Sequence, residues 1–310
     1  MTKYNMEKHL IREKIIKTAR EFFYKQDFHE VVTPILNSAL PLEPHLRPFT
    51  TVYDNGKEKK ELYLAMSPER GIKKILSQGM GNCFALSKSF RNYERVGSVH
   101  MREFLMLEWY RKSAVYTDIM NDAEKLVQLI NQKMGNKVAM KEGAFPRLSL
   151  ISLFKEKVGV DLAELITSDQ LMRETAQKMG YTVAGGTTWE ELYTQLFVNE
   201  IESRFSLKPF FLVDFPARIS PLCKAQKDRP LFAERFELYV HKMELGNGNT
   251  ENTDIELVRT TFEEESKKTG MPIDKEFLSS LEGMKNDSYA GIGLGVDRLV
   301  MLYTNSDIFV

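Results

Sequence analysis

The stretch GIGLGVDRLVML, Gly291 to Leu302, decides the fold of this chain. Its glycines follow a G-x-G-x-G spacing, which differs from the G-x-G-x-x-G of a dinucleotide fold and from a P-loop. Residues two apart on a β-strand face the same side. We therefore expect a strand with a bare glycine face, which a flat ring can approach, and an apolar face in the core. Arg298 follows on a predicted helix, although tight helix packing would also explain the glycines.

A second informative stretch is FRNYERVGSVHMREFLMLEWY, Phe90 to Tyr110. It predicts two strands joined by a polar loop at about 94–102, with Arg91 at the end of the first strand. On the return strand Glu108 shares one face with apolar and aromatic residues. A carboxylate there is costly to bury unless it meets a cation, which indicates a substrate with an ammonium group. The alternative is a surface hairpin with ordinary ion pairs.

A third stretch, ERFELYVHKMELGNGNTENTD, starts at Glu234 and carries Glu237 and Glu244 seven residues apart. A hairpin turn between them would bring both carboxylates together. Two carboxylates beside substrate phosphates suit Mg²⁺, whereas a charged strand edge is the simpler alternative.

The remaining pattern predicts helices and strands that do not alternate strictly. Apolar spacing favours a helix over 7–24, a strand at Val31 and Val32, and a helix from Ser67 as its N-cap with Pro68 in its first turn. The middle, about 117–206, is rich in predicted helices. This order favours an α+β fold on an antiparallel sheet over a Rossmann sheet.

Composition indicates an ordinary globular enzyme. The 310 residues include 43 basic and 43 acidic side chains, and this zero net charge lowers the expectation of nucleic-acid binding. The two cysteines, Cys83 and Cys223, form no metal or redox motif and are expected in the core. No apolar run reaches membrane-spanning length and no signal core is present, so we expect a cytoplasmic protein without membrane contact.

Taken together, these stretches resemble the three signature motifs of the class II aminoacyl-tRNA synthetases. DFHEVVTPIL, with Pro34, resembles motif 1; FRNYE…HMREF resembles motif 2; GIGLGVDRL resembles motif 3. The resemblance extends from about residue 8 to the end. It implies a class II antiparallel sheet flanked by helices, one catalytic domain over 1–310 with a helix-rich insertion at about 117–206, and a homodimer formed through motif 1.

Within that class the chain resembles the lysyl type, on SPE (67–69), ISPLCK (219–224), ERFELY and ELGNG. Motif 1 begins almost at once, so we expect no anticodon-binding domain. LEWYR (107–111) resembles the short lysyl-tRNA synthetase paralogue that lysylates translation elongation factor P. This implies activation of lysine or β-lysine with ATP and transfer to a lysine of that protein, with tRNA an unlikely acceptor. Gly246 and Gly293 replace the paralogue's usual alanines, which leaves lysine and β-lysine both open.

The resemblance also implies roles for individual residues. Arg91 and Arg298 would be catalytic. The expected ATP contacts are Arg91, Asn92, Glu94, His100, Phe104, Glu244, Leu245, Gly295 and Arg298. The expected amino-acid contacts are Ser67, Pro68, Glu69, Glu108, Tyr110, Asn247, Glu251 and Gly293. Mg²⁺ would be carried by Glu237 and Glu244.

Three rival readings stay open from the sequence: a stand-alone lysyl-tRNA synthetase core, an amino-acid ligase acting on a small molecule, and a catalytically silent amino-acid sensor. The last is disfavoured because both motif arginines, Arg91 and Arg298, are present.

Overall fold

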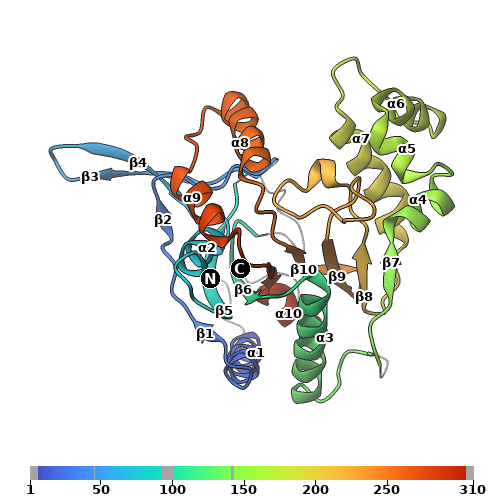
Figure 1. Ribbon diagram of the computed structural model, residues 1–310. Coiled ribbons are helices and arrows are strands. Elements are labelled where there is room, and N and C mark those ends of the chain that lie inside the picture. Colours follow the sequence, from blue (N-terminus) through green and yellow to red (C-terminus); the bar gives the residue numbers. More distant parts are fainter. Residues whose placement is uncertain (1–5, 45, 93–100, 141–142, 305–310) are drawn as a thin grey trace.

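The computed structural model describes residues 6–44, 46–92, 101–140 and 143–304. Its centre is an eight-stranded sheet in the order β1-β5-β6-β11-β10-β9-β8-β7 (Figure 1). Only the outer pairs, β1 with β5 and β7 with β8, are parallel. The strands are β1 (His29–Glu30), β5 (Cys83–Phe90), β6 (Glu103–Lys112), β7 (Arg147–Ser149), β8 (Phe210–Val213), β9 (Arg235–Val240), β10 (Met243–Thr250) and β11 (Tyr289–Gly295). The predicted α+β class with an antiparallel sheet is confirmed.

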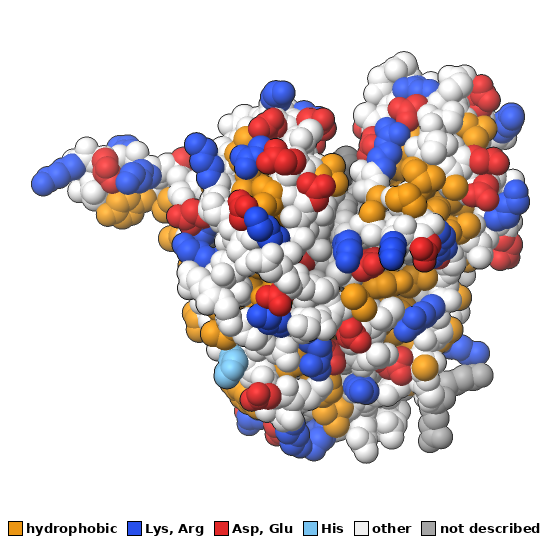
Figure 2. All heavy atoms as spheres, viewed as in Figure 1, with side chains coloured by type: hydrophobic (Ala, Val, Ile, Leu, Met, Phe, Trp, Pro, Cys, Tyr) orange, Lys and Arg blue, Asp and Glu red, His pale blue; other side chains and the backbone are white. Residues whose placement is uncertain are grey.

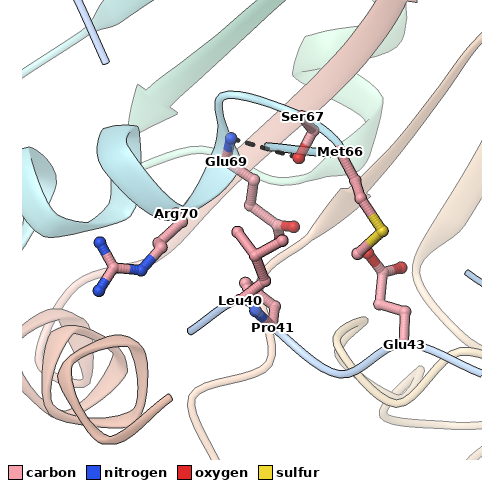
Figure 3. Close-up of a pocket in the computed structure, with 7 residues that line it drawn as sticks. All are labelled: Leu40, Pro41, Glu43, Met66, Ser67, Glu69 and Arg70. Atoms are coloured by element: carbon pink, nitrogen blue, oxygen red, sulfur yellow. Dashed lines mark hydrogen bonds between the residues drawn. The ribbon is translucent and has the colours of Figure 1, made fainter. Parts of the chain in front are cut away.

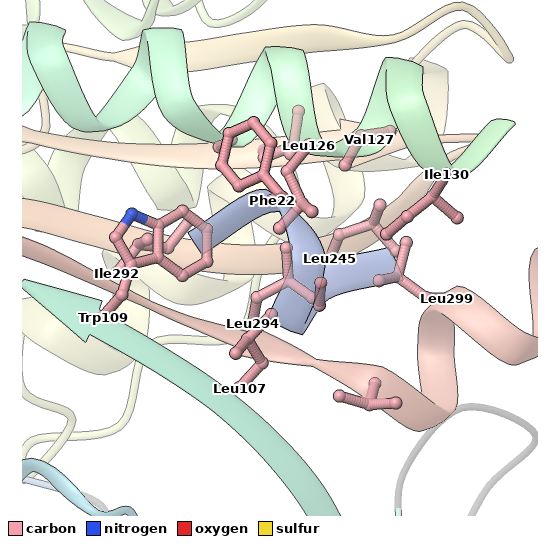
Figure 4. Close-up of a cluster of buried hydrophobic side chains, with 14 of the residues drawn as sticks. Phe22, Leu107, Trp109, Leu126, Val127, Ile130, Leu245, Ile292, Leu294 and Leu299 are labelled. Atoms are coloured by element: carbon pink, nitrogen blue, oxygen red, sulfur yellow. The ribbon is translucent and has the colours of Figure 1, made fainter. Parts of the chain in front are cut away.

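Helices cover one face of this sheet and build the main core. These helices are α1 (Met6–Tyr24), α3 (Tyr116–Lys133) and α10 (Val296–Tyr303). Figure 4 shows their apolar side chains packed against Leu107, Trp109, Leu245, Ile292 and Leu294 of the strands. Since such apolar contact area is the main favourable term in folding, this layer fixes the strands in place.

The glycine strand β11 lies in the middle of the sheet, between β6 and β10. Ile292, Leu294 and Val296 are at most 2% exposed and point into the main core. The predicted division into an apolar face and a glycine face is therefore confirmed.

The helix-rich middle of the chain contributes to two cores. α3 packs on the central sheet. A second core forms where the following helices meet β8 and β9. Those helices are α4 (Leu150–Lys157), α5 (Leu162–Thr167), α6 (Asp169–Lys178) and α7 (Trp189–Leu196), followed by a π-helical turn (Phe197–Ile201). Together they form one lobe of the molecule.

The opposite lobe contains α2 (Glu69–Leu76), α8 (Ile255–Thr269) and α9 (Lys275–Met284). α8 begins after Asp254, whose side chain accepts from the amide of Leu257, and it ends at Gly270 with φ 72°, a left-handed conformation that glycine adopts without a steric penalty. Figure 2 shows the surface hollowed between this lobe and the lobe of α4–α7. The face of the sheet not covered by α1 and α3 therefore lies between two lobes.

A small sheet projects from the body in the order β2-β4-β3. It is built from β2 (Leu36–Asn37), β3 (Thr50–Asp54) and β4 (Lys59–Leu64). Among the described residues, no helix is both long and apolar enough to span a bilayer.

Two local expectations were wrong. The strand predicted at Val31 and Val32 ends at Glu30, because the amide of Val31 makes the last backbone bond to β5 and Val32 is 93% exposed. Helix α2 begins at Glu69 with Pro68 at its N-cap position, rather than Ser67. The Ser67 hydroxyl still accepts from the amide of Glu69 at 3.4 Å.

Candidate active site

One row of residues crosses four strands on the face of the sheet that lies between the lobes. Glu237 of β9 is opposite Asn247 of β10, which is opposite Gly293 of β11, which is opposite Glu108 of β6. Directly opposed residues of neighbouring strands face the same side. The pairing thus brings a predicted metal ligand and three predicted amino-acid contacts side by side.

The next row shows that the glycine face is only partly bare. A Cβ placed on Gly291 would lie 2.5 Å from the ring of Tyr110, so that ring already fills the space above this glycine. At Gly293 a Cβ would lie 3.1 Å from Met106 Sδ and 3.8 Å from Glu108 Oε2. The expectation of a continuous bare strip is therefore wrong at Gly291, whereas Gly293 borders the carboxylate of Glu108.

Glu108 and Glu251 make the inner end of this site strongly acidic. Glu108 is 3% exposed and accepts from the hydroxyl of Tyr110 at 2.9 Å. Burial, and then the charge of Glu69, raise the pKa of Glu108 well above its ordinary range. Burial also raises the pKa of Glu251 to about 7, although the nearby ammonium of Lys73 opposes that shift. Buried carboxylates with raised pKa values indicate a site that gains stability from a cation.

Lys73 already supplies one such cation, and sequence reasoning missed it. Its side chain is fully buried, with Nζ 2.6 Å from Glu69 Oε1 and 2.5 Å from Glu251 Oε2. Burial alone would lower the pKa of Lys73, but the charges of Glu251 and Glu69 outweigh it and raise that pKa. The i,i+4 spacing of Glu69 and Lys73 on α2 was a usable signal, whereas their approach to Glu251 is a tertiary contact.

A pocket opens beside this cluster, between the start of α2 and the loop that follows β2. Figure 3 shows Glu69 and Glu43 directed into this space from opposite sides, while Arg70 points away from it. Arg70 pairs instead with Asp274. The pocket is lined by Leu40, Pro41, Glu43, Met66, Ser67, Glu69 and Arg70. It contains two predicted contacts, Ser67 and Glu69, and one residue that sequence reasoning missed, Glu43.

Two arginines stand at the outer part of the site. Arg298, at the start of α10, donates from Nη1 to the carbonyl oxygen of Glu244 at 2.6 Å and lies 3.4 Å from Glu244 Oε2. Arg91, just after β5, places its guanidinium 5.4 Å from the ring centre of Phe104. Its Nε is buried without a hydrogen-bond partner among the described residues. Such an arginine is suited to bind an anion.

Three other predicted contacts need comment. Glu94 and His100 lie outside the described residues. Leu245 is 1% exposed and belongs to the main core, so its side chain faces away from the site. If side chains alternated strictly along β10, Leu245 would face the site and Glu244 the core. The register shift between Glu244 and Gly246 in the β9–β10 pairing reverses this. Only the backbone of Leu245 is therefore available to a ligand.

The family profile of the class II tRNA synthetases (D, K and N) matches residues 1–308. The chain belongs to the class II tRNA synthetases. This membership confirms the resemblance seen in the three sequence motifs.

Individual relatives of this class II synthetase are ligases of two kinds. A protein of Aquifex aeolicus named elongation factor P–(R)-β-lysine ligase homolog is 35% identical over 95% of this chain and 94% of its own length. The elongation factor P–(R)-β-lysine ligase of Avibacterium paragallinarum is 36% identical over 94% of this chain and 90% of its own. A lysine–tRNA ligase of Carboxydothermus hydrogenoformans is 32% identical over 96% of this chain but only 63% of its own length. The predicted enzyme class, a ligase, is confirmed.

In this synthetase core the two acidic side chains predicted to hold metal, Glu237 and Glu244, are near enough for the charge of one to act on the other. Burial, and then the charge of Glu244, raise the pKa of Glu237 to about 7. Glu237 also accepts from Arg235 at 2.8 Å and from the hydroxyl of Tyr239 at 3.1 Å. Within the described ranges, no group of three or more His, Cys, Asp or Glu side chains could hold a metal ion. Any metal here would be held by two carboxylates and the ligand's own oxygens.

Asp297 of the synthetase's third motif has a structural role. Its carboxylate accepts from the backbone amide of Leu105 at 2.6 Å and pairs with Arg12 of α1. Asp297 is 3% exposed and joins α10 to α1 and β6. Only Arg298 is directed to the site.

Proposed function

We propose that this protein activates lysine or β-lysine with ATP and transfers it to a lysine side chain of translation elongation factor P. The observation that carries this proposal is the buried acidic end of the site, where Glu108 accepts from Tyr110 and the charge of the buried Glu251 acts on both. Carboxylates enclosed in this way favour a ligand that brings positive charge, and a diamino acid brings two ammonium groups.

Arg91 and Arg298 supply positive charge for the anionic groups of the substrates, opposite in sign to the acidic end of the site. Arg91 would bind the carboxylate of the amino acid and the α-phosphate of ATP, because its guanidinium presents several donors in one plane. Arg298 would bind the outer phosphates. The amino-acid carboxylate then attacks the α-phosphorus, pyrophosphate leaves, and an aminoacyl-adenylate forms. Positioning and charge neutralisation are what the protein contributes to such a step.

The pair Glu237 and Glu244 fits Mg²⁺, because the charge of Glu244 raises the cost of a negative charge on the buried Glu237. A bound Mg²⁺ would neutralise phosphate charge, as it does with substrate phosphates in general. Glu237 would be held in position for this role by Arg235 and Tyr239.

Transfer requires an uncharged amine of the acceptor, which attacks the carbonyl carbon of the adenylate and releases AMP. Elongation factor P is favoured as the acceptor by the relatives named for it, which match this chain over at least 90% of their own length. A second candidate function is the attachment of lysine to tRNA, because a lysine–tRNA ligase matches 96% of this chain. A small-molecule acceptor is the third possibility.

A single labelling experiment separates these functions. The protein is incubated with ATP, Mg²⁺ and labelled lysine or β-lysine, together with elongation factor P or transcribed lysine tRNA. Label on elongation factor P, and none on a version of it whose acceptor lysine is replaced by arginine, is the expected result. Label on tRNA alone would establish the second function, and AMP formation with neither macromolecule labelled would contradict both.

We also propose that the chain is one catalytic domain that works in the cytoplasm as a homodimer. Apolar side chains are exposed where the first motif and the small sheet lie, at Val32 (93%), Leu36 (53%) and Val52 (60%). Exposed apolar patches of this kind are typical of contact surfaces, which supports pairing with a second copy through this region.

A further inference from the structure

Glu43 is the one acidic side chain of the pocket that has no assigned role. It lies in the loop after β2, shortly after the first motif but outside all three, and it lines the pocket together with Ser67 and Glu69. Among the described residues its carboxylate makes no hydrogen bond or ion pair. A carboxylate directed into a pocket without a partner is costly, which indicates that a ligand group meets it there.

The surroundings of Glu43 show which group that is. The protein encloses its carboxylate, and this enclosure, followed by the charge of Glu69, raises the pKa of Glu43 to about 7. Glu69 and Glu43 enter the pocket from opposite sides, as Figure 3 shows. Two carboxylates across one pocket favour a cation between them.

Glu69 alone does not satisfy an ammonium group. An ammonium has three N–H donors, and Glu69 already accepts from Lys73 at 2.6 Å. One of its two oxygens is thus engaged inside the protein. A second carboxylate is needed to receive the remaining donors of a substrate amine.

The position of Glu43 along the pocket distinguishes the two amines of the substrate. Glu108 and Glu251 would bind the inner amine, and Glu251 is linked to Glu69 through the buried Lys73. Glu43 belongs to a different part of the site, since Glu108 and Glu251 do not line its pocket, and the positive charges of Arg91, Lys73 and Arg235 all act on it. Because Arg91 is the proposed carboxylate ligand, the amine next to that carboxylate is the one near Glu43.

We propose that Glu43 is a second carboxylate ligand, opposite Glu69, for the backbone ammonium of the amino acid. This role rests on the proposed activation of lysine or β-lysine. In β-lysine the amine is one carbon farther from the carboxylate, a shift of about 1.5 Å. Acceptors on both sides of the pocket receive an amine attached at either carbon.

The test compares ligands that differ only in this amine. Calorimetric titration gives the Kd of the full-length wild-type protein for lysine, β-lysine and 6-aminohexanoate, which keeps the carboxylate and the terminal ammonium but lacks the backbone amine. The same titrations are run on Glu43→Gln, on Glu43→Asp, and on Glu58→Gln as a control, since Glu58 is on the exposed hairpin. Melting curves show that each variant is folded.

Glu43→Gln is expected to weaken binding of the diamino acid about 10- to 100-fold, the range for a lost hydrogen bond to a charged group. Binding of 6-aminohexanoate should change less than about twofold, and Glu43→Asp should recover part of the loss. An equal loss for both ligands would assign Glu43 a structural role and overturn the inference, as would an unchanged affinity for the diamino acid. If the wild type binds neither diamino acid, the proposed function itself fails and the inference falls with it.

Discussion

The side chain of Arg298 is held in place by a hydrogen bond to strand β10. Its guanidinium donates to the carbonyl of Glu244, so it is positioned before any ligand arrives. Replacing it with alanine should lower lysine-dependent ATP–pyrophosphate exchange by at least about 100-fold, the scale for losing one charge-stabilising donor group. The exposed Arg259 of α8 offers a matched control, Arg259→Ala, which should keep full activity. Normal exchange in a folded Arg298→Ala protein would refute the assignment.

Glu251 serves the side-chain ammonium in the proposed site, and it also pairs with Lys73. Glu251→Gln should therefore weaken lysine binding by about 10-fold or more while the Kd for ATP changes little. Both constants are measured by titration, with Glu256→Gln on the exposed face of α8 as the control. If affinity for lysine and for ATP fell to the same extent, the ammonium role would be wrong.

At this scale, sequence patterns identified some residues and missed others for a physical reason. Glu108 was predicted because an acidic residue on an apolar strand face is unusual within its own segment. Lys73 and Glu43 were missed because each has an ordinary local pattern, a helical i,i+4 pair and a loop residue. Lys73 is notable for its burial against Glu251, and Glu43 for lining a pocket opposite Glu69, and both are contacts between segments that are separate in the sequence.

The glycine strand has a role in packing that differs along its length. At Gly291 an added methyl group would lie 2.5 Å from the Tyr110 ring and 2.8 Å from the carbonyl oxygen of Trp109. Backbone cannot move away easily, so Gly291→Ala should lower the free energy of unfolding by about 1–3 kcal/mol. The control is Gly186→Ala, where the methyl group would meet no atom within 4 Å. Denaturant titration measures both, and equal stabilities would contradict the close approach.

Among elements, hairpins were the most predictable part of the fold. β5–β6 and β9–β10 are formed by neighbouring segments with clear strand patterns, and both were found where predicted. The covering of Gly291 by Tyr110 could not be predicted, since it depends on the register of β6 against β11. The strand predicted at Val31 and Val32 ends early because its pairing with β5 stops at the amide of Val31, and strand propensity does not show where pairing stops.

When no ligand is bound, the enclosed carboxylates of the site lower the free energy of unfolding of the whole protein at neutral pH. The pKa values of Glu43, Glu237 and Glu251 are raised to about 7 from an ordinary value of 4.5. Between these pH values the folded protein keeps protons that the unfolded chain releases, so these groups make stability fall as pH rises from about 4.5 to about 7. Melting temperatures across this window should show that fall, and saturating lysine should reduce it.

A variant isolates this effect from the other titrating groups. Glu251→Gln removes one of the three carboxylates, so its melting temperature should decline less steeply with pH than that of the wild type. An identical pH profile in the variant would show that Glu251 does not titrate in this range.

Dimer formation through the first motif is testable with one surface change. Val32→Glu places a charge at a side chain that is 93% exposed in the single chain, so the fold should be unaffected. Light scattering should show a monomer for this variant and a dimer for the wild type. Leu207→Glu, at a residue 58% exposed elsewhere on the surface, should remain dimeric. A wild type that is monomeric at micromolar concentration would contradict the proposal.

The link from Asp297 to Arg12 and Leu105 also has a consequence for how the protein is made. Arg12 and Asp297 are 285 residues apart in the chain, so the ribosome delivers the second on the order of 15–60 s after the first, at about 5–20 residues per second. During that interval α1 has no α10 to pack against, so the part of its apolar surface that α10 covers stays exposed. The catalytic core is therefore completed only after α10 has been synthesised, and we expect no partly active enzyme from a chain that stops before α10.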